Sequence, residues 1–141
     1  MCWFSDKTPL KRVARKDMKV YKVLKCGFNN SVSSIFFKKT WILGVEEKMS
    51  YDIVVQWIGD KLVRIDDGLH SLKNKPFVWN DLWFIEYDGC SYPVFKADVV
   101  YNERVFECTI PKGSIYYMND QGEIVSDRLI INGVCDCGVC D

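Results

Sequence analysis

Three cysteines near the end of the chain form its densest group of potential metal ligands. These residues are Cys135, Cys137 and Cys140, and thiolates at this spacing can share one tetrahedral Zn²⁺. A structural zinc site uses four ligands, so a fourth would have to come from another cysteine or from the single histidine. Because a second C-x-x-C pair is absent from the sequence, we predict no tightly bound metal. We interpret 134–141 as a flexible or redox-active cysteine-rich tail.

Two other residues suggest nucleophilic catalysis. If Met1 is removed, the Cys2 thiol lies beside a free α-amine, which N-terminal nucleophiles use as their base. His70, the only histidine, could activate Cys2 or another thiol, since a Cys–His pair requires only proximity in space. Each residue also has a structural interpretation, as a small residue near the start of the chain and as a hydrogen-bonded histidine after a turn. We favour the structural interpretation for both.

Aromatic side chains make up 14% of the sequence and could provide a stacking surface for a base or nucleotide. Most must contribute to the core, because aromatic residues dominate the packing of small β-proteins. No glycine-rich phosphate loop accompanies them, and we predict no cofactor. The residues that we select as candidate ligand contacts are Tyr21, His70, Trp79, Trp83 and Tyr116.

Composition limits the class of protein and its partners. With 141 residues and 48% hydrophobic side chains, the chain is predicted to fold as a single domain, 1–141. Nineteen basic and nineteen acidic side chains cancel, which argues against duplex nucleic acid as the partner. The sequence shows no secretory h-region and no apolar run of about 18 residues. We therefore expect a cytoplasmic protein with reduced thiols and no membrane partner, and we leave the oligomeric state open.

Turn residues predict two hairpins. Asp88-Gly89 joins the apolar segments 82–87 and 90–95, and this pair favours a type I′ turn because both central residues need a positive φ. Gly59-Asp60 separates 51–58 from 61–65 and suggests a type II′ turn. Pro93 cannot donate a hydrogen bond to a neighbouring strand, so we expect it at a sheet edge or a bulge.

The stretch 105–131 gives the clearest strand pattern. Phe106, Cys108 and Ile110 alternate with polar residues or valine, so this side of the strand should face a core. Pro111 and Gly113, as second and fourth residues, suit a type I turn. A hairpin loop is expected at 119–122. The three strands predict a β-meander, with a bulge at Ser126 where alternation fails.

The remaining chain adds further strands and short helices. Residues 18–24 and 35–43 have strand composition, whereas Thr8-Pro9 before Leu10 favours a short helix at 8–14. A single helical turn is expected within 69–75. The predicted fold is therefore a β-dominated α+β domain of antiparallel hairpins and a meander, with one or two short helices.

Several segments together resemble an uncharacterised group of small proteins from gut Bacteroidetes and their phages. The resemblance implies a bacterial or phage cytoplasmic setting and an accessory role in a mobile element. The segments are Met1-Cys2, 20–24, Gly68-Leu69-His70-Ser71, 108–114, Tyr116-Tyr117 and Val125-Ser126-Asp127.

A second resemblance covers only the octapeptide 107–114. ECTIPKGS is similar to the last motif of ADP-ribosyltransferases, in which a catalytic Glu begins a strand that ends in a turn with Pro and Gly. The resemblance implies that Glu107 would contact the nicotinamide ribose. The chain departs from that family at Val105, where many members have Glu or Gln, and at Tyr21-Lys22, where they have Arg or His. It also lacks the Ser-Thr-Ser triplet.

These observations favour a non-catalytic binding protein of phage or mobile-element type. It would sequester a small nucleotide-like ligand or occlude a host protein. The alternative is an enzyme, either a degenerate or divergent ADP-ribosyltransferase-like protein that uses Glu107, or an N-terminal nucleophile that pairs Cys2 with His70. We favour binding because each enzymatic interpretation lacks at least one essential group.

Overall fold

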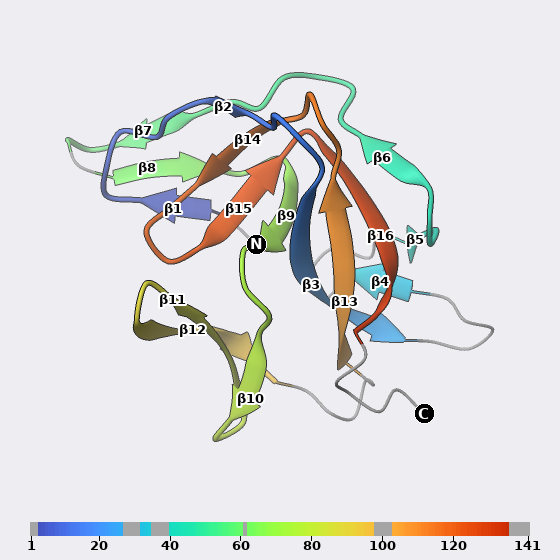
Figure 1. The fold of residues 1–141 in the computed structure, drawn as a ribbon. Coiled ribbons are helices and arrows are strands. Elements are labelled where there is room, and N and C mark those ends of the chain that lie inside the picture. The colour runs from blue at the N-terminus through green and yellow to red at the C-terminus, as the bar shows by residue number, and fades with distance from the viewer. Residues whose placement is uncertain (1–2, 27–31, 35–39, 61, 98–102, 136–141) are drawn as a thin grey trace.

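The computed structural model describes residues 3–26, 32–34, 40–60, 62–97 and 103–135 (Figure 1). Within these ranges every regular element is a β-strand, and all strand pairs are antiparallel. The β-dominated, antiparallel part of the predicted fold is therefore confirmed. None of the described segments forms a helix of the length and apolarity that crossing a membrane requires.

Ten of the described strands form one large sheet. Its order is β2-β14-β15-β9-β3-β13-β16-β6, and β4 extends it by pairing with β3 and β5. The centre is the β3–β13 pair, in register from Glu103↔Lys25 to Ile110↔Met18. The bounds of these strands are β2 (Arg12–Val13), β3 (Met18–Cys26), β4 (Val32–Ser34), β5 (Thr40–Trp41), β6 (Glu46–Lys48), β9 (Leu69–Leu72), β13 (Glu103–Ile110), β14 (Ile115–Met118), β15 (Glu123–Ser126) and β16 (Arg128–Val134).

Asp127 is a corner at which the chain leaves one part of this sheet and enters another. β15 pairs with β14 and β9, whereas β16, which begins one residue later, pairs with β13 and β6. The corner is fixed because Ile115 N donates to Asp127 Oδ1 at 2.9 Å and Met49 N donates to Asp127 O at 2.9 Å. The sheet must therefore curl on itself, since consecutive strands lie on either side of β9, β3 and β13 (Figure 1).

This corner corrects two predictions about 105–131. The expected bulge at Ser126 is wrong, because β15 ends there and the chain turns rather than continuing beside the same neighbours. The expected meander is also wrong, because β13 pairs with β3 and β16 and not with β14. Only the β14–β15 hairpin forms, with its loop at 119–122 as predicted. Asn119 Oδ1 closes that loop by accepting from the backbone N–H groups of Gln121 and Glu123, both at 3.0 Å.

The main core lies on the inner side of the curled sheet. Phe106, Cys108 and Ile110 are all buried there, which confirms the side of β13 that alternation indicated. Phenylalanine and isoleucine at such sites each contribute several kcal/mol, since truncation to Ala typically costs about 2–5 kcal/mol. The other buried members of this cluster are Ala14, Val20, Leu24, Val32, Trp41, Ile124, Leu129 and Ile131.

A three-stranded sheet of order β1-β8-β7 packs against the outer side of β14 and β15 (Figure 1). Its strands are β1 (Trp3–Ser5), β7 (Gln56–Ile58) and β8 (Leu62–Ile65). Trp3 is the largest buried side chain of this second core, and its Nε1 donates to Glu123 O at 2.8 Å. The β7–β8 hairpin is confirmed, but Ile58 pairs with Leu62, so three residues separate the strands rather than the two of a type II′ turn.

The remaining sheet is β10 (Phe77–Trp79), β11 (Leu82–Tyr87) and β12 (Cys90–Lys96), in that order. The type I′ turn between β11 and β12 is confirmed, because φ is 52° at Asp88 and 80° at Gly89. The prediction for Pro93 is confirmed too. It lies on an edge strand, beside a register shift at which Trp83 pairs with Phe95 and Phe84 pairs with Pro93.

Both predicted helices are wrong in the described structure. Within 8–14 the only regular element is β2, and Ala14 exchanges backbone hydrogen bonds with Gly113 and Ser114 at 2.8 and 2.9 Å. Within 69–75 the first four residues form β9.

The turn after β13 is shifted by one residue from its predicted position, because Ser114 N donates to Pro111 O at 3.1 Å and Gly113 has a φ of 90°. Gly113 is therefore the third turn residue, as type II requires.

Candidate functional site

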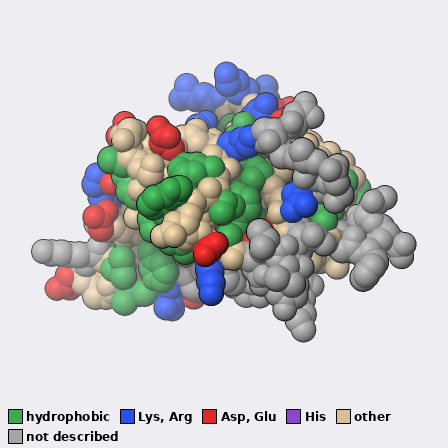
Figure 2. Space-filling model, turned by 90° about the horizontal axis from the view of Figure 1, so that it is seen from below, with side chains coloured by type: hydrophobic (Ala, Val, Ile, Leu, Met, Phe, Trp, Pro, Cys, Tyr) green, Lys and Arg blue, Asp and Glu red, His purple; other side chains and the backbone are tan. Residues whose placement is uncertain are grey.

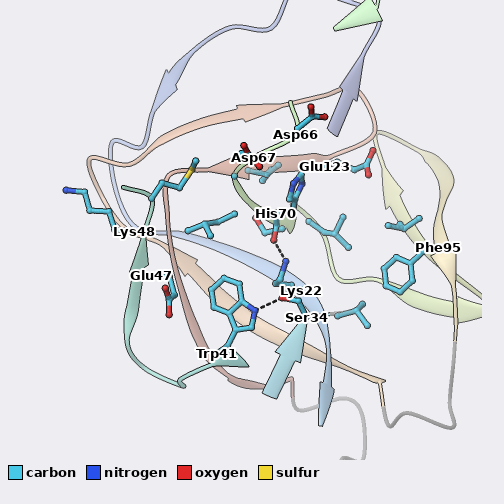
Figure 3. Close-up of a pocket in the computed structure, with 18 of the residues that line it drawn as sticks. Lys22, Ser34, Trp41, Glu47, Lys48, Asp66, Asp67, His70, Phe95 and Glu123 are labelled. Atoms are coloured by element: carbon cyan, nitrogen blue, oxygen red, sulfur yellow. Dashed lines mark hydrogen bonds between the residues drawn. The ribbon is translucent and has the colours of Figure 1, made fainter. Parts of the chain in front are cut away.

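A cavity of about 380 Å³ opens beside β3 and β9 (Figure 3). Its walls come mainly from β3, β9, the β8–β9 connection and residues 47–51, with Trp41, Tyr51 and Phe95 as aromatic residues. The volume falls within the range of about 300–1,000 Å³ that is usual for small-molecule sites. Polar and charged residues from several elements also line it, and their geometry decides what the cavity can bind.

His70 on β9 contributes an imidazole to this cavity (Figure 3). Its Nε2 atom is buried and has no hydrogen-bond partner among the described residues. Burial lowers the pKa of His70 to about 3, the positive charge of Lys22 acts in the same direction, and a hydrogen bond to the Asp66 backbone opposes them. The ring is therefore neutral near pH 7 and presents an unused polar atom.

Lys22 provides a positive charge held in place by neighbouring groups. Its Nζ donates to His70 O at 2.7 Å and lies 5.6 Å from the centre of the Trp41 ring. The indole Nε1 of Trp41 in turn donates to Ser34 Oγ at 2.7 Å (Figure 3). Lys22, Trp41 and Ser34 therefore form a connected polar wall whose side chains are already oriented.

Ser71 is a second lining residue with an unused polar atom. The residue has only 4% of its surface exposed, lines the cavity, and its Oγ has no partner among the described residues. A buried hydroxyl without a hydrogen bond costs about 1–3 kcal/mol. His70 pairs with Val125 and Ser71 pairs with Ile124, so the two side chains leave opposite faces of β9. Because buried polar groups are almost always satisfied, each of these unpartnered atoms indicates a polar guest beside it, either ordered water or a ligand.

Acidic side chains outnumber basic ones around the cavity. Glu47, Asp66, Asp67 and Glu123 line it together with Lys22 and Lys48 (Figure 3). Asp66 Oδ1 is paired with Arg64 Nε at 2.8 Å. Burial raises the pKa of the Glu123 carboxyl, and a hydrogen bond from Asn119 opposes the shift.

Glu123 also borders a second cavity, of about 550 Å³. The two cavities share Val94 and Glu123, so these side chains lie where one cavity meets the other. The polar residues that line the second cavity are Ser5, Asp6, Asn119, Asp120, Gln121, Tyr92 and Glu123.

The structure separates the residues selected for the ADP-ribosyltransferase interpretation from this site. Glu107 pairs in register with Tyr21, and its carboxylate forms an ion pair with Lys19 at 3.2 Å. Neither Glu107 nor Tyr21 is among the described residues that line the cavity containing His70. Glu107 and His70 therefore do not meet in that cavity.

The aromatic candidates do not form one surface either. Trp83 is only 7% exposed and donates from Nε1 to Glu103 Oε1 at 3.0 Å, so it has no open ring face to offer a ligand. Trp79 is 67% exposed on β10, and Tyr116 on β14 packs against the main core. None of the three lines the cavity described above.

The cysteine predictions fall largely outside the described residues. Cys2, Cys137 and Cys140 lie there, and Cys135 directly follows β16, where its N–H donates to Val105 O at 2.9 Å. Among the described residues no three His, Cys, Asp or Glu side chains gather as a metal site would require.

Lys22, Trp41, Ser71 and Glu123 were missed as site residues by the sequence analysis. One signal was present for Lys22, because it occupies an inward position of β3 between the buried Val20 and Leu24. A lysine in the apolar phase of an alternating strand is a polar residue facing a core, and it needs partners there.

Comparisons with protein-family models, with curated proteins and with solved structures find no match to this chain. The described structure itself defines an antiparallel β-sheet protein with a ligand-sized, partly polar cavity.

Proposed function

We propose that this chain is a non-catalytic binding protein that takes a small nucleotide-like ligand into the cavity beside β9. The observation that carries the proposal is the buried, unpartnered Nε2 atom of His70, a residue that lines a cavity of about 380 Å³. A planar ring with polar substituents would satisfy this atom and pack against the apolar walls.

The state of His70 supports binding rather than catalysis. A general base works best when its pKa lies near the operating pH, whereas burial holds the pKa of His70 at about 3. Such a ring is a weak base, but it is a good neutral hydrogen-bonding group for a ligand. Glu107, the other candidate for catalysis, lies outside the cavity and pairs with Lys19.

The biological role that fits this proposal is sequestration. A phage or mobile-element protein in the cytoplasm of a bacterium could remove a signalling molecule or metabolite simply by binding it. Such a protein needs affinity and abundance, and it does not need turnover. The resemblance to small phage proteins supports this role.

A thermal-shift screen tests the proposal directly. Ligands that bind only the native state raise its stability, by about 2.7 kcal/mol when their concentration is 100 times Kd. The panel would contain nucleobases, nucleosides, nucleotides, cyclic nucleotides and NAD. We expect at least one of these compounds to raise Tm.

Two variants locate the effect. His70→Phe removes the unpartnered Nε2 and should abolish the ligand-induced shift, since the ligand loses its hydrogen bond. Trp79→Ala changes an exposed aromatic side chain outside the cavity and should retain the shift. Equal shifts in wild type and His70→Phe would contradict the assignment of the site. Nicotinamide release from NAD that disappears in Glu107→Gln would instead establish the transferase.

A protein partner is the second candidate. Phe77, Val78 and Trp79 on β10 are all exposed, and Phe77 and Trp79 both pack on the ring of Phe84 with centroid distances of 5.9 Å. Figure 2 views the molecule from the side where this sheet lies and shows hydrophobic side chains gathered there. If no compound of the panel raises Tm, the small-ligand proposal is contradicted and a host-protein partner at this surface becomes the favoured function.

A further inference from the structure

We propose that the ligand is an amine rather than a phosphate, with its positive charge held by Glu123 where the two cavities meet. This inference rests on the proposed binding function and specifies the class of ligand. It narrows the nucleotide-like ligand proposed above, because the favoured compound keeps the planar ring and carries a cationic group in place of the phosphate.

Glu123 is the only ionisable residue common to both cavities among the described residues. Asn119 positions it twice, by accepting from Glu123 N at 3.0 Å and by donating from Nδ2 to Glu123 Oε1 at 3.0 Å. No other described group bonds to this carboxylate. The side chain is thus held in place while retaining acceptor capacity for a cation.

The second cavity reinforces this preference. Asp6, Asp120 and Glu123 line it, and its described lining contains no lysine or arginine. Lys7 forms an ion pair with Asp120 at 2.7 Å, which offsets the charge of Asp120. The carboxylates of Asp6 and Glu123 therefore make the electrostatic potential of this cavity negative. A phosphate placed here would meet like charges, whereas an ammonium group would meet opposite ones.

The charges of the first cavity do not reverse this preference for a cation over a phosphate. Lys22 is its most buried positive charge, and that charge is already directed to the carbonyl of His70 and the ring of Trp41. The ring of His70 presents its Nε2 atom as a hydrogen-bond acceptor, because the backbone carbonyl of Asp66 can only accept. That carbonyl selects the tautomer with the N–H at Nδ1 and leaves a lone pair on Nε2.

These groups together define the ligand. A ring N–H or amino group would donate to His70 Nε2 in the first cavity, and an ammonium arm would reach Glu123. Val94, which borders both cavities, would contact the apolar link between the two parts. The chemical class is therefore an aromatic or heteroaromatic amine.

Two sets of compounds test the inference on two different ring systems. Each set contains an amine, an alcohol and a phosphate that share one ring. One set is 5′-amino-5′-deoxyadenosine, adenosine and AMP, and the other is tryptamine, tryptophol and tryptophol phosphate, whose indole N–H can donate to His70 Nε2. Calorimetric titration gives Kd for each. We expect the amine of at least one set to bind about tenfold or more tightly than its alcohol, and the phosphate to bind more weakly than the alcohol.

Variants assign the preference to Glu123. In Glu123→Gln the advantage of the amine over the alcohol should disappear while the alcohol retains its affinity. Asp6→Asn, at an exposed position, should reduce the affinity advantage of the amine over the alcohol by a smaller factor. This variant tests the same preference if Glu123→Gln does not fold. Glu86→Gln changes net charge equally on an exposed residue that lines neither cavity and should leave the amine preference intact.

The outcomes separate this inference from the proposed function. If amine and alcohol bind equally, or the phosphate binds most tightly, the amine assignment is wrong while ligand binding stands. If Glu86→Gln abolishes the preference as fully as Glu123→Gln, the effect comes from net charge and the assignment to Glu123 is wrong. If nothing in either set or in the broader nucleotide panel binds, both proposals fail.

Discussion

The neutral ring of His70 makes the stability of the fold depend on pH. Its pKa is about 3 in the folded chain and about 6.5 when the chain unfolds. Between these values the unfolded state binds a proton that the folded state does not, so stability is lost as pH falls. We expect a loss on the order of 4 kcal/mol across this window from His70 alone.

Urea denaturation at a series of pH values between 7 and 4 measures this effect. Carboxylates titrate in the same range, so the informative quantity is the difference between wild type and His70→Phe. That difference should shift in favour of the variant as pH falls. Parallel stability curves for the two proteins would show that His70 is not held neutral by burial.

Two cysteines should differ widely in reactivity. Cys108 is fully buried, and burial raises its pKa to about 12, whereas Cys90 is exposed. Because the thiolate is the nucleophile, Cys90 but not Cys108 should be alkylated in native protein, and Cys108 should react after unfolding. Iodoacetamide labelling followed by peptide mass spectrometry checks this order. Equal labelling of both cysteines in the native protein would mean that β13 does not face a closed core.

Gly68, directly before β9, is required by close packing. A Cβ added there would clash with Val125 Cγ2, and the buried Val125 side chain cannot move into open space. We therefore expect Gly68→Ala to destabilise the fold by about 1–3 kcal/mol.

The matched control for that substitution is Gly133→Ala in β16, where a Cβ would meet nothing within 4 Å. This variant should change stability by less than about 0.5 kcal/mol. Chemical denaturation measures both. A similar small effect at the two glycines would contradict the packing of β9 against β15.

At the level of elements, local patterns predicted individual strands and hairpins but not their order. Alternation identified the buried side of β13, and Asp88-Gly89 identified a type I′ turn, since both signals arise within a few residues. The change of neighbours at Asp127 depends on partners at Met49 and Ile115. Such distant partners leave no periodic signal in the sequence.

Partners that are distant in the sequence also explain why the predicted helices do not form. Thr8-Pro9 is a favourable local start for a helix, but Ala14 is buried in the main core and its backbone bonds to 113–114. Pairing with β14 therefore determines the conformation of this segment, because tertiary contacts override a weak local propensity.

Across the whole molecule, the site was predicted only in part. His70 was selected from its chemistry, and the structure places it in the cavity. Ser71 and Glu123 are ordinary polar residues in sequence, and their importance arises from burial and from the meeting of strands that are far apart along the chain. The account therefore depends on whether a ligand reaches His70.

Nuclear magnetic resonance of His70 measures this most directly, because His70 is the only histidine in the native sequence. Its ring signals, observed in tag-free protein labelled with ¹⁵N and ¹³C at histidine, need no further assignment. On titration with a compound that raises Tm, we predict that the Nε2 resonance shifts in saturable fashion, with the Kd found by calorimetry, while the ring stays neutral. A compound that raises Tm and leaves both ring nitrogens of His70 unchanged at saturation would contradict the account.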